Sequence, residues 1–446
     1  MTMTHHHPSR ETAHTEGAPQ PGAAPDGVGD TSAAGASATT EHVDRRVEID
    51  AAGGPLAVGV VDLETGVCTF RNDEQQLASM DRAFVLLRSD GWPVGTEVLP
   101  MLDGRLLDGI VKELATEMPA PAVRGAATGE SMSVVLCTRN RPEKLAAALP
   151  GFIELLEDHI ELIVVDNAPR DSRTADVVSE YGERVRYVVE PTPGLSRARN
   201  CGLAAATGKF VTFTDDDVIP DPAFLRVVDA TFAANDGAVC VSGTVLPASL
   251  LTLAERRFQE FGGYQRNFVE TRLHLAMDPP PSKLFPFHPR LVGTGANMSF
   301  RAEALRSIGG FDVALGSGTP SRGGEDIDVG VRLLLAGHLV VRQPAAVVWH
   351  HSHAGDAELK AQIEDYGCGL AAVFTKFAMQ RSTAPMLLRR APLGLSTLFR
   401  SDSVKNETRS ATYPKSLRNA ELRGIRSGPG AYRRSARRAR RLAADG

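Results

Sequence analysis

The sequence contains few cysteines, and none of them stands in a spacing typical of a metal site or a disulfide framework. The five cysteines of the 446-residue chain are scattered, and no C-x-x-C motif occurs. An odd, scattered set argues against both a disulfide scaffold and a structural zinc site. Several of these cysteines lie in apolar runs, where cysteine behaves as a small hydrophobic residue. We therefore expect a reducing compartment.

Long apolar runs and a secretory leader are also missing. No uninterrupted apolar stretch approaches the roughly 18 residues that a membrane-spanning helix needs, and the first residues are polar, without the apolar core of a signal peptide. We expect a cytoplasmic protein that is soluble or peripherally attached at the inner face of the cell membrane. The net charge of -5 argues against a protein that coats nucleic acid through its overall charge.

Composition divides the chain into five parts. Residues 1–46 are rich in Ala, Gly, Pro, Thr and Ser, which predicts a disordered segment. Residues 47–118 form short alternating segments separated by glycine-containing turns, which predicts a small β-rich module. A linker covers residues 119–131, the main domain covers residues 132–375, and residues 376–446 are expected to be helical and basic.

The main domain alternates strand and helix patterns. Near-continuous apolar runs such as "MSVVLCT", "IELIVVD" and "KFVTFT" are separated by helical segments. Such strands lack period-two polarity, which predicts an α/β fold with a mostly parallel sheet and helices on its faces. Ligands of these sheets bind beyond the carboxyl ends of the strands. The polar residues that directly follow the strands, namely Thr138 to Arg141, Asp166 and Asp215 to Asp217, are therefore expected along one edge.

Three consecutive carboxylates, Asp215, Asp216 and Asp217, end the strand "FVTFT". Adjacent negative charges are unfavourable unless a positive group neutralises them, and Mn²⁺ or Mg²⁺ prefers oxygen ligands. Because alternate residues of an extended segment face the same way, Asp215 and Asp217 can share one ion while Asp216 points elsewhere. A solvated acidic turn that closes the strand is the alternative interpretation.

A second acidic group occurs in "GGEDIDVGVRLLLAGH", where Glu325, Asp326 and Asp328 start an apolar helix. Acids near a helix start often cap it and suit its dipole, and this is the better interpretation of Asp328. Glu325 and Asp326 follow a long glycine-rich loop, and a carboxylate in such a loop could act as a general base.

Two further groups have ordinary explanations as well as functional ones. His350, His351 and His353 follow a strand, and a neutral imidazole of one of them could bind a metal, but spacing does not choose among the three. The helix after "EPTPG" begins near Arg197, Arg199 and Asn200. Its backbone N–H groups and its arginines could bind phosphate, or the arginines could form a solvated basic face.

Together these segments resemble the family 2 glycosyltransferases with the GT-A fold. The matching pieces are, in order, "VVLCTRNRPEKL", "ELIVVDNAPRD", "EPTPGLSRARNCGL", "GKFVTFTDDDVIPDP", "GTGANMSFRAEALRSIGGFD", "GGEDIDVGVRLLLAGH" and "VVWHHSH". They cover about residues 132–375. The N-terminal module also looks like one that precedes this domain in some bacterial members. The resemblance implies an inverting enzyme that uses a divalent metal, Mn²⁺ or Mg²⁺, and a UDP-, GDP- or dTDP-sugar, of which a UDP-sugar is expected first.

The resemblance also implies roles for individual residues. It assigns nucleotide-sugar binding to a set of loop and strand-end residues: Thr138, Arg139, Asn140, Asp166, Arg197, Arg199, Asn200, Asp215 and Asp216. It assigns the metal to Asp215, Asp217 and His350. Asp326 matches the general base of inverting members, and Glu325 is the close alternative.

The expected function is therefore sugar transfer to an acceptor hydroxyl in polysaccharide, cell-envelope or glycoconjugate biosynthesis. The acceptor could be a saccharide, a lipid-linked molecule or a small molecule. A nucleotidyltransferase is one alternative, but such enzymes need a glycine-rich loop after the first strand, and "CTRNRPEKL" has no glycine. A non-catalytic nucleotide-sugar-binding scaffold is the other, and the intact Asp215, Asp217 and Asp326 argue against it.

The basic tail "YRRSARRARRLAADG" is a further feature of the sequence. It could hold the protein at an anionic membrane surface. A solvated tail without a partner is at least as good an interpretation, and nucleic acid is a poorer third.

Overall fold

The computed structural model describes residues 46–47, 49–118, 127–260, 264–265, 268–277, 282, 284–289, 292–390 and 413–444. All of them belong to one unit, Asp44–Gly446. Most of the predicted disordered segment and of the predicted linker lies outside the described residues.

The N-terminal part forms a five-stranded sheet in the order β3-β2-β4-β5-β6. Its elements are β2 (Ala57–Asp62), β3 (Cys68–Phe70), α1 (Glu74–Leu77), β4 (Arg82–Ser89), β5 (Trp92–Leu102), β6 (Arg105–Leu106) and α2 (Ile110–Glu117), after the short η1 (Ala51–Gly53). Asp90 and Gly91 between β4 and β5 both have positive φ, 50° and 75°, as the tight turns of β-hairpins require. The predicted β-rich module is confirmed.

The main sheet has the order β11-β16-β12-β15-β10-β7-β8-β9, with β14 paired to β16. Its strands are β7 (Met132–Thr138), β8 (Ile160–Asn167), β9 (Val185–Glu190), β10 (Phe210–Asp215), β11 (Val218–Pro220), β12 (Ala238–Pro247), β14 (Thr271–Leu273), β15 (Met298–Arg301) and β16 (Leu339–His350). Strands β9, β8, β7 and β10 run parallel, whereas β15 is antiparallel to both of its neighbours. The predicted α/β class is confirmed, and the sheet is mixed. A separate short pair joins β1 (Arg46–Val47) to β13 (Tyr264–Gln265).

Helices cover both faces of this sheet. Successive residues of a strand point to opposite faces, so each central strand packs against helices on both sides. Val134 and Leu136 of β7 pack with α3, α4 and α6, while Val135 packs with α5, α8 and α9. These helices are α3 (Pro142–Ile153), α4 (Arg173–Ser179), α5 (Leu195–Ala205), α6 (Phe224–Ala234), α8 (Ala302–Ser307) and α9 (Glu325–Leu335); α7 (Leu253–Gln259) and η2 (Gly182–Arg184) lie in the connections. A strand buried on both faces carries no polar alternation, which explains the continuous apolar runs.

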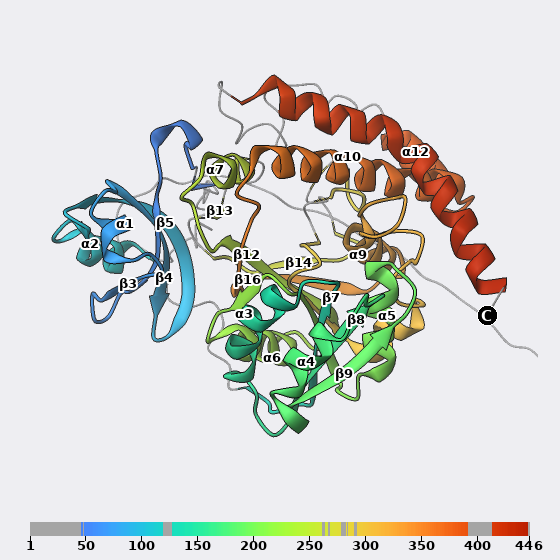
Figure 1. The fold of residues 1–446 in the computed structure, drawn as a ribbon, viewed down its shortest axis with the longest axis horizontal. Helices are drawn as coiled ribbons and strands as arrows, with labels where there is room; N and C mark the ends of the chain where they lie inside the picture. Colours follow the sequence, from blue (N-terminus) through green and yellow to red (C-terminus); the bar gives the residue numbers. More distant parts are fainter. Residues whose placement is uncertain are drawn as a thin grey trace, which may run out of the picture. The chain divides into compact units, whose positions relative to one another are not determined.

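Two long helices follow the sheet, α10 (Asp356–Met379) and α12 (Lys415–Ala444), and they run side by side (Figure 1). Glycines allow a close approach of the two backbones. A Cβ atom on Gly424 would lie 1.9 Å from the Glu364 carbonyl oxygen, and one on Gly428 would lie 2.7 Å from that of Cys368. The prediction of a helical C-terminal region is confirmed for its described part, and residues 391–412 and 445–446 lie outside the described residues. Among the described residues, no helix is both long enough and apolar enough to cross a membrane.

Candidate functional site

A cavity of about 1490 Å³ opens at the carboxyl ends of the central strands. Strand ends contribute Thr138 from β7, Asn167 from β8, Asp215 from β10 and His350 from β16. The register pairs Asp215 with Cys137 and Thr138 with Asp166, so the polar residues predicted to share one edge of the sheet do so. The start of α9, one face of α10, residues between 284 and 296, and part of α12 also contribute to the walls.

The three aspartates after β10 occupy three different environments. Asp215 and Asp217 line the cavity, whereas Asp216 is fully buried behind it. Asp216 Oδ2 accepts a hydrogen bond from Thr138 Oγ1 at 2.6 Å, and Asp216 Oδ1 lies 3.1 Å from Arg141. Burial raises the pKa of Asp216 to about 6, against the lowering effects of Arg141 and Thr138. The predicted alternation of the three side chains is observed, and Asp216 is not on the cavity wall.

Asp217 lies beside His350 because β11 pairs antiparallel with β16 and aligns Val218 with His350. His350 Nε2 is 3.2 Å from Asp217 Oδ1, while Arg141 and Lys144 contact Asp217 Oδ2 at 3.0 and 2.9 Å. Burial alone would raise the pKa of Asp217, but His350 and then Lys144 hold it below its ordinary value. Of the three candidate histidines, His350 is thus the one that contacts an aspartate of the triplet through its ring.

The donor atoms at this point suit a hard divalent cation with few protein ligands. Asp217 Oδ1 and His350 Nε2 are 3.2 Å apart, close to the ~3 Å that separates neighbouring ligands in an octahedral shell of about 2.0–2.1 Å radius. Mg²⁺ in particular is usually held by one or two carboxylates together with substrate phosphates. Within the described residues no group of three or more His, Cys, Asp and Glu side chains is arranged to hold a metal by itself. The arrangement fits a metal whose shell a diphosphate would complete.

Arg199 connects the aspartate triplet to the start of α9. Its guanidinium, 1% exposed, donates to Glu325 Oε1 at 2.8 Å, to Asp215 Oδ1 at 3.2 Å and to the Gly295 carbonyl oxygen at 3.1 Å. Position 295 has no room for a side chain, because a Cβ would lie 2.5 Å from Arg199 Nη2. Arg199 lines the cavity, and its bonds to Glu325 and Asp215 position these two acids. The predicted contact of Arg199 with the nucleotide sugar stays a prediction.

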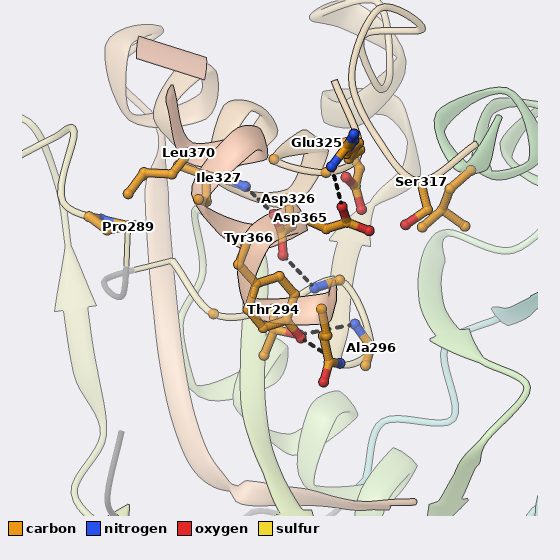
Figure 2. Close-up of a pocket in the computed structure, with 18 of the residues that line it drawn as sticks. Pro289, Thr294, Ala296, Ser317, Glu325, Asp326, Ile327, Asp365, Tyr366 and Leu370 are labelled. Atoms are coloured by element: carbon orange, nitrogen blue, oxygen red, sulfur yellow. Dashed lines mark hydrogen bonds and ion pairs between the residues drawn. The ribbon is translucent and has the colours of Figure 1, made fainter. Parts of the chain in front are cut away.

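Glu325 and Asp326 differ sharply although they are neighbours on α9. Glu325 is buried against Arg199, and its Oε2 has no hydrogen-bond partner. Burial, and then the charge of Asp326, raises the pKa of Glu325 to about 7. Asp326 is half-buried on the cavity wall, where its Oδ2 accepts a hydrogen bond from the Gly295 N–H at 3.2 Å. Figure 2 shows Asp326 between Glu325 and the α10 residues Asp365 and Tyr366.

Asp328 has a different role from the one the sequence suggested. Gly324 is the residue at the N-cap of α9, and Asp328 is fully buried one turn further on. Its carboxylate binds Arg332 Nε at 2.8 Å and Lys376 Nζ at 2.6 Å, which ties α9 to α10. The capping interpretation of Asp328 was wrong, because burial next to two cations outweighs the attraction of the helix start.

The predicted nucleoside loop is only partly on the cavity wall. Thr138 and Arg139 line the cavity, whereas Asn140 has a positive φ of 52° and accepts a hydrogen bond from the Arg170 N–H at 3.0 Å. Asp166 is fully buried; its Oδ2 accepts a hydrogen bond from the Tyr187 hydroxyl at 2.8 Å, and its Oδ1 has no partner. Burial raises the pKa of Asp166. Its neighbour Asn167 is the β8 residue that lines the cavity.

Two predicted residues of α5 are also off the cavity wall. Asn200 exchanges two hydrogen bonds of 2.8 Å with the backbone of Phe311 and so fixes the loop after α8. Arg197 is half-buried and does not line the cavity. The prediction that these side chains touch a nucleotide sugar stays a prediction.

Sequence reasoning did not single out several residues of the site. Lys144 pairs with Asp217 beside Arg141, which the sequence had already placed among the strand-end residues, and the basic run "TRNRPEK" directly after the first strand was the available signal. Asp365 and Tyr366 come from α10, far along the chain, where no motif marks them.

Residues 133–306 match the model of glycosyl transferase family 2. Over 194 residues the chain is 26% identical to a glucosyl-dolichyl phosphate glucuronosyltransferase of Haloferax volcanii, covering 42% of this chain and 57% of that protein. It is 25% identical over 296 residues to a pre-mycofactocin glycosyltransferase of Mycobacterium tuberculosis, covering 65% of this chain and 58% of that protein. The chain thus spans little more than half the length of these curated relatives.

Solved structures with a similar fold include a mannosyltransferase of Pyrobaculum calidifontis in complex with GDP-Man and Mn²⁺. It has a TM-score of 0.41 and 18% identity, and the match covers 74% of this chain and 79% of that one. A second is S. aureus TarS 1-349 in complex with UDP-GlcNAc, with a TM-score of 0.42 and 13% identity, over 70% of this chain and 92% of that one. Residues 133–306 are therefore similar to glycosyl transferase family 2.

Proposed function

We propose that the protein transfers a sugar from a nucleotide-diphosphate sugar to an acceptor hydroxyl, with inversion at the anomeric carbon and with Mn²⁺ or Mg²⁺. The observation that carries the proposal is that Asp215, Asp217, His350 and Asp326 line one cavity. Asp215 and Asp217 lie within residues 133–306, which match the family model. The curated relatives named as glycosyltransferases support the same reaction class. A UDP-sugar is the first donor to test, and GDP- and dTDP-sugars follow.

Donor binding is assigned to the end of β10 and the start of α3. Asp217 and His350 would hold the metal, with Asp215 beside them, and when bound the metal would act as a Lewis acid on the leaving diphosphate. Arg139 and Arg141 supply fixed positive charge next to this point. Asp166, the residue before the cavity-lining Asn167, remains the proposed contact of the base.

The transfer step is assigned to Asp326. The acceptor oxygen forms a bond to the anomeric carbon, its proton passes to a carboxylate oxygen of Asp326, and the bond from the anomeric carbon to the diphosphate oxygen breaks. The nucleoside diphosphate leaves with that electron pair. Glu325 is the alternative base, but one of its oxygens already accepts a hydrogen bond from Arg199, whereas Asp326 borders open space.

The variant Asp326→Asn tests the assignment of the base. Loss of one general base costs about 10²- to 10⁴-fold in rate, so turnover should fall by that range while donor binding stays close to that of the parent. Asp356→Asn is the matched control, because Asp356 is exposed at the start of α10 and lies outside the cavity lining. Turnover by Asp326→Asn equal to that of the parent would remove Asp326 from the mechanism.

Peripheral membrane contact through α12 is proposed as a second property. Arg433, Arg434, Arg437, Arg438 and Arg441 are exposed, and the opposite side of the helix, which includes Ala431 and Ser435, is buried. The single acid of α12, Glu421, is also buried. Each basic residue near an anionic surface contributes about 1 kcal/mol, so a lipid-linked or cell-envelope acceptor would suit this face.

Flotation with vesicles that contain phosphatidylglycerol tests this contact. The parent should float with anionic vesicles at low salt, and a variant with these five arginines changed to glutamine should not. Equal flotation of the two proteins, or none of either, would rule out the membrane contact.

A further inference from the structure

One face of α10 forms a wall of the cavity along almost the whole helix. The residues recur at helical spacing, and they are Glu358, Gln362, Asp365, Leu370, Phe374 and Ala378. At a rise of 1.5 Å per residue, the distance from Glu358 to Ala378 is about 30 Å. The cavity is therefore much longer than the region of the carboxylates alone.

The chemistry of this wall changes along the helix. The first half presents Glu358, Gln362 and Asp365, which can form hydrogen bonds. The second half presents Leu370, Phe374 and Ala378, which cannot, and Thr375, whose hydroxyl already donates to the Ala371 carbonyl oxygen. Most of the neighbouring lining is apolar too and includes Leu284, Phe287, Ile327, Leu387 and Leu388, with Arg390 and Glu421 as its charged members. Leu388 is 66% exposed. Large apolar side chains that stay open around a concave surface mark a site for an apolar ligand.

The change from polar to apolar walls occurs at the proposed base. Asp326 borders the polar part, and the next residue, Ile327, borders the apolar part. In Figure 2, Ile327, Leu370 and Pro289 lie to the left of Asp326, and Glu325 and Ser317 lie to its right. A molecule whose hydroxyl reaches Asp326 from the α10 side would therefore place its next atoms against apolar side chains.

From this arrangement we propose that the acceptor is an amphiphile: a hydroxyl-bearing head group attached to an apolar chain, which binds between the second half of α10 and residues 284–289. This inference rests on the proposed function, because it concerns the second substrate of that reaction. A purely polar saccharide would leave its hydroxyl groups without partners along Leu370 and Phe374, and such burial is costly. An apolar chain instead gains free energy with each methylene group that it buries.

Calorimetric titration of the full-length protein with methyl, hexyl and octyl β-D-glucoside, below micelle formation, tests the inference. Because each buried methylene strengthens binding, octyl glucoside should bind at least about tenfold more tightly than methyl glucoside. Phe374→Asp should abolish this dependence on chain length, and Phe374→Leu should keep it. Met379→Asp is the matched control on α10, since Met379 is exposed and lies outside the cavity lining. Thermal unfolding of each variant verifies that it folds.

The outcomes separate this inference from the proposed function. Equal affinity for the three glucosides would contradict the proposal of an amphiphilic acceptor. It would mean that the apolar wall is filled by another part of the chain or does not bind ligand. Chain-length dependence that survives in Phe374→Asp would also overturn it, because binding would then occur elsewhere. A titration of the same parent protein with UDP and Mn²⁺ reports on the donor site alone, so its failure would contradict the proposed function instead.

Discussion

The identical side chains of Asp215, Asp216 and Asp217 lie in three different environments because their neighbours differ. Asp215 faces Arg199, Asp216 is buried with Thr138, and Asp217 meets His350. The alternation followed from the extended backbone and could be predicted from the sequence. The cationic partners could not, because Arg141, Lys144 and Arg199 meet the aspartates only after the strands pair.

Replacement of Asp217 should weaken metal-dependent binding of a nucleoside diphosphate. Asp217→Asn removes one charged oxygen of the pair with His350, so we expect at least about a tenfold loss of affinity for UDP in the presence of Mn²⁺. Asp216→Asn is the control. It should keep this affinity and lose about 1–3 kcal/mol of stability, since its buried hydrogen bond with Thr138 is altered. Calorimetry with UDP and Mn²⁺ measures both, and equal affinities for the two variants would contradict the assignment.

Glu325 should make the stability of the protein depend on pH. Its pKa is raised to about 7 in the folded chain, while an unfolded glutamate releases its proton near its ordinary value of about 4.3. Between these two values the folded state holds the extra proton, so this contribution to stability is present at low pH and is lost as pH rises towards 7.

Thermal unfolding of the parent and of Glu325→Gln between pH 4.5 and 7.5 measures this contribution. The variant should show a smaller decline in stability over this range, because glutamine does not titrate. Parallel curves for the two proteins would mean that Glu325 does not take up a proton in this window.

The buried bonds of Arg199 could not be predicted from the sequence. An arginine at a helix start is compatible with phosphate binding, and the sequence offered that reading. Its burial depends on Gly295 and Glu325, which lie 96 and 126 positions away. No local pattern carries that information.

At the scale of elements, the site depends on how strand ends and helix faces meet. The pairing of β11 with β16 brings His350 to Asp217, although the two are far apart in the sequence. The strands and the helices of the main domain could be predicted from apolar runs. The wall formed by α10 could not, because helical periodicity identifies a face but not the surface that this face covers.

The packing of α10 on α12 gives a test at this scale. Alanine favours a helix over glycine by about 1 kcal/mol, yet a Cβ on Gly424 would lie 1.9 Å from the Glu364 carbonyl oxygen. Gly424→Ala should therefore destabilise the protein by about 1–3 kcal/mol, because the two helices must move apart. In Gly430→Ala the nearest group would be the flexible Arg434 side chain at 3.2 Å, so this variant should be neutral or slightly more stable.

Denaturant unfolding of the two glycine variants compares these expectations directly. If Gly424→Ala were as stable as Gly430→Ala, the close approach of α10 and α12 would be wrong. Loss of stability in both variants would mean that the substitutions act within α12 and not through its packing on α10.

At the scale of the whole molecule, the N-terminal sheet contacts the strands that carry the site. Arg88 of β4 forms an ion pair with Asp221, just after β11, and Arg71 lies over the ring of Trp349, next to His350. A bridge between Leu56 and Leu250 adds a backbone link. The sequence indicated a β-rich module without visible chemistry. Its contact with the segments around Asp217 and His350 became apparent only in three dimensions.

The fold class followed from the sequence because buried strands and amphipathic helices leave local patterns. Part of the candidate site could also be predicted. Local sequence patterns identify strand ends and a helix start, and these are the positions of Asp215, Asp217, His350 and Asp326. The proposed acceptor side could not be predicted, since it is built from α7, α9, α10 and loops that are distant in the sequence. These contacts are set by packing and not by a motif.

Metal-dependent binding of a nucleotide sugar tests the central claim most directly. The full-length protein would be titrated by calorimetry with UDP-, GDP- and dTDP-sugars, each with Mn²⁺ and again with excess chelator. We expect at least one of them to bind with Mn²⁺ and to lose its affinity when the metal is chelated. Binding of none of them in the presence of Mn²⁺, by a protein that is folded, would contradict a nucleotide-sugar site at Asp215, Asp217 and His350.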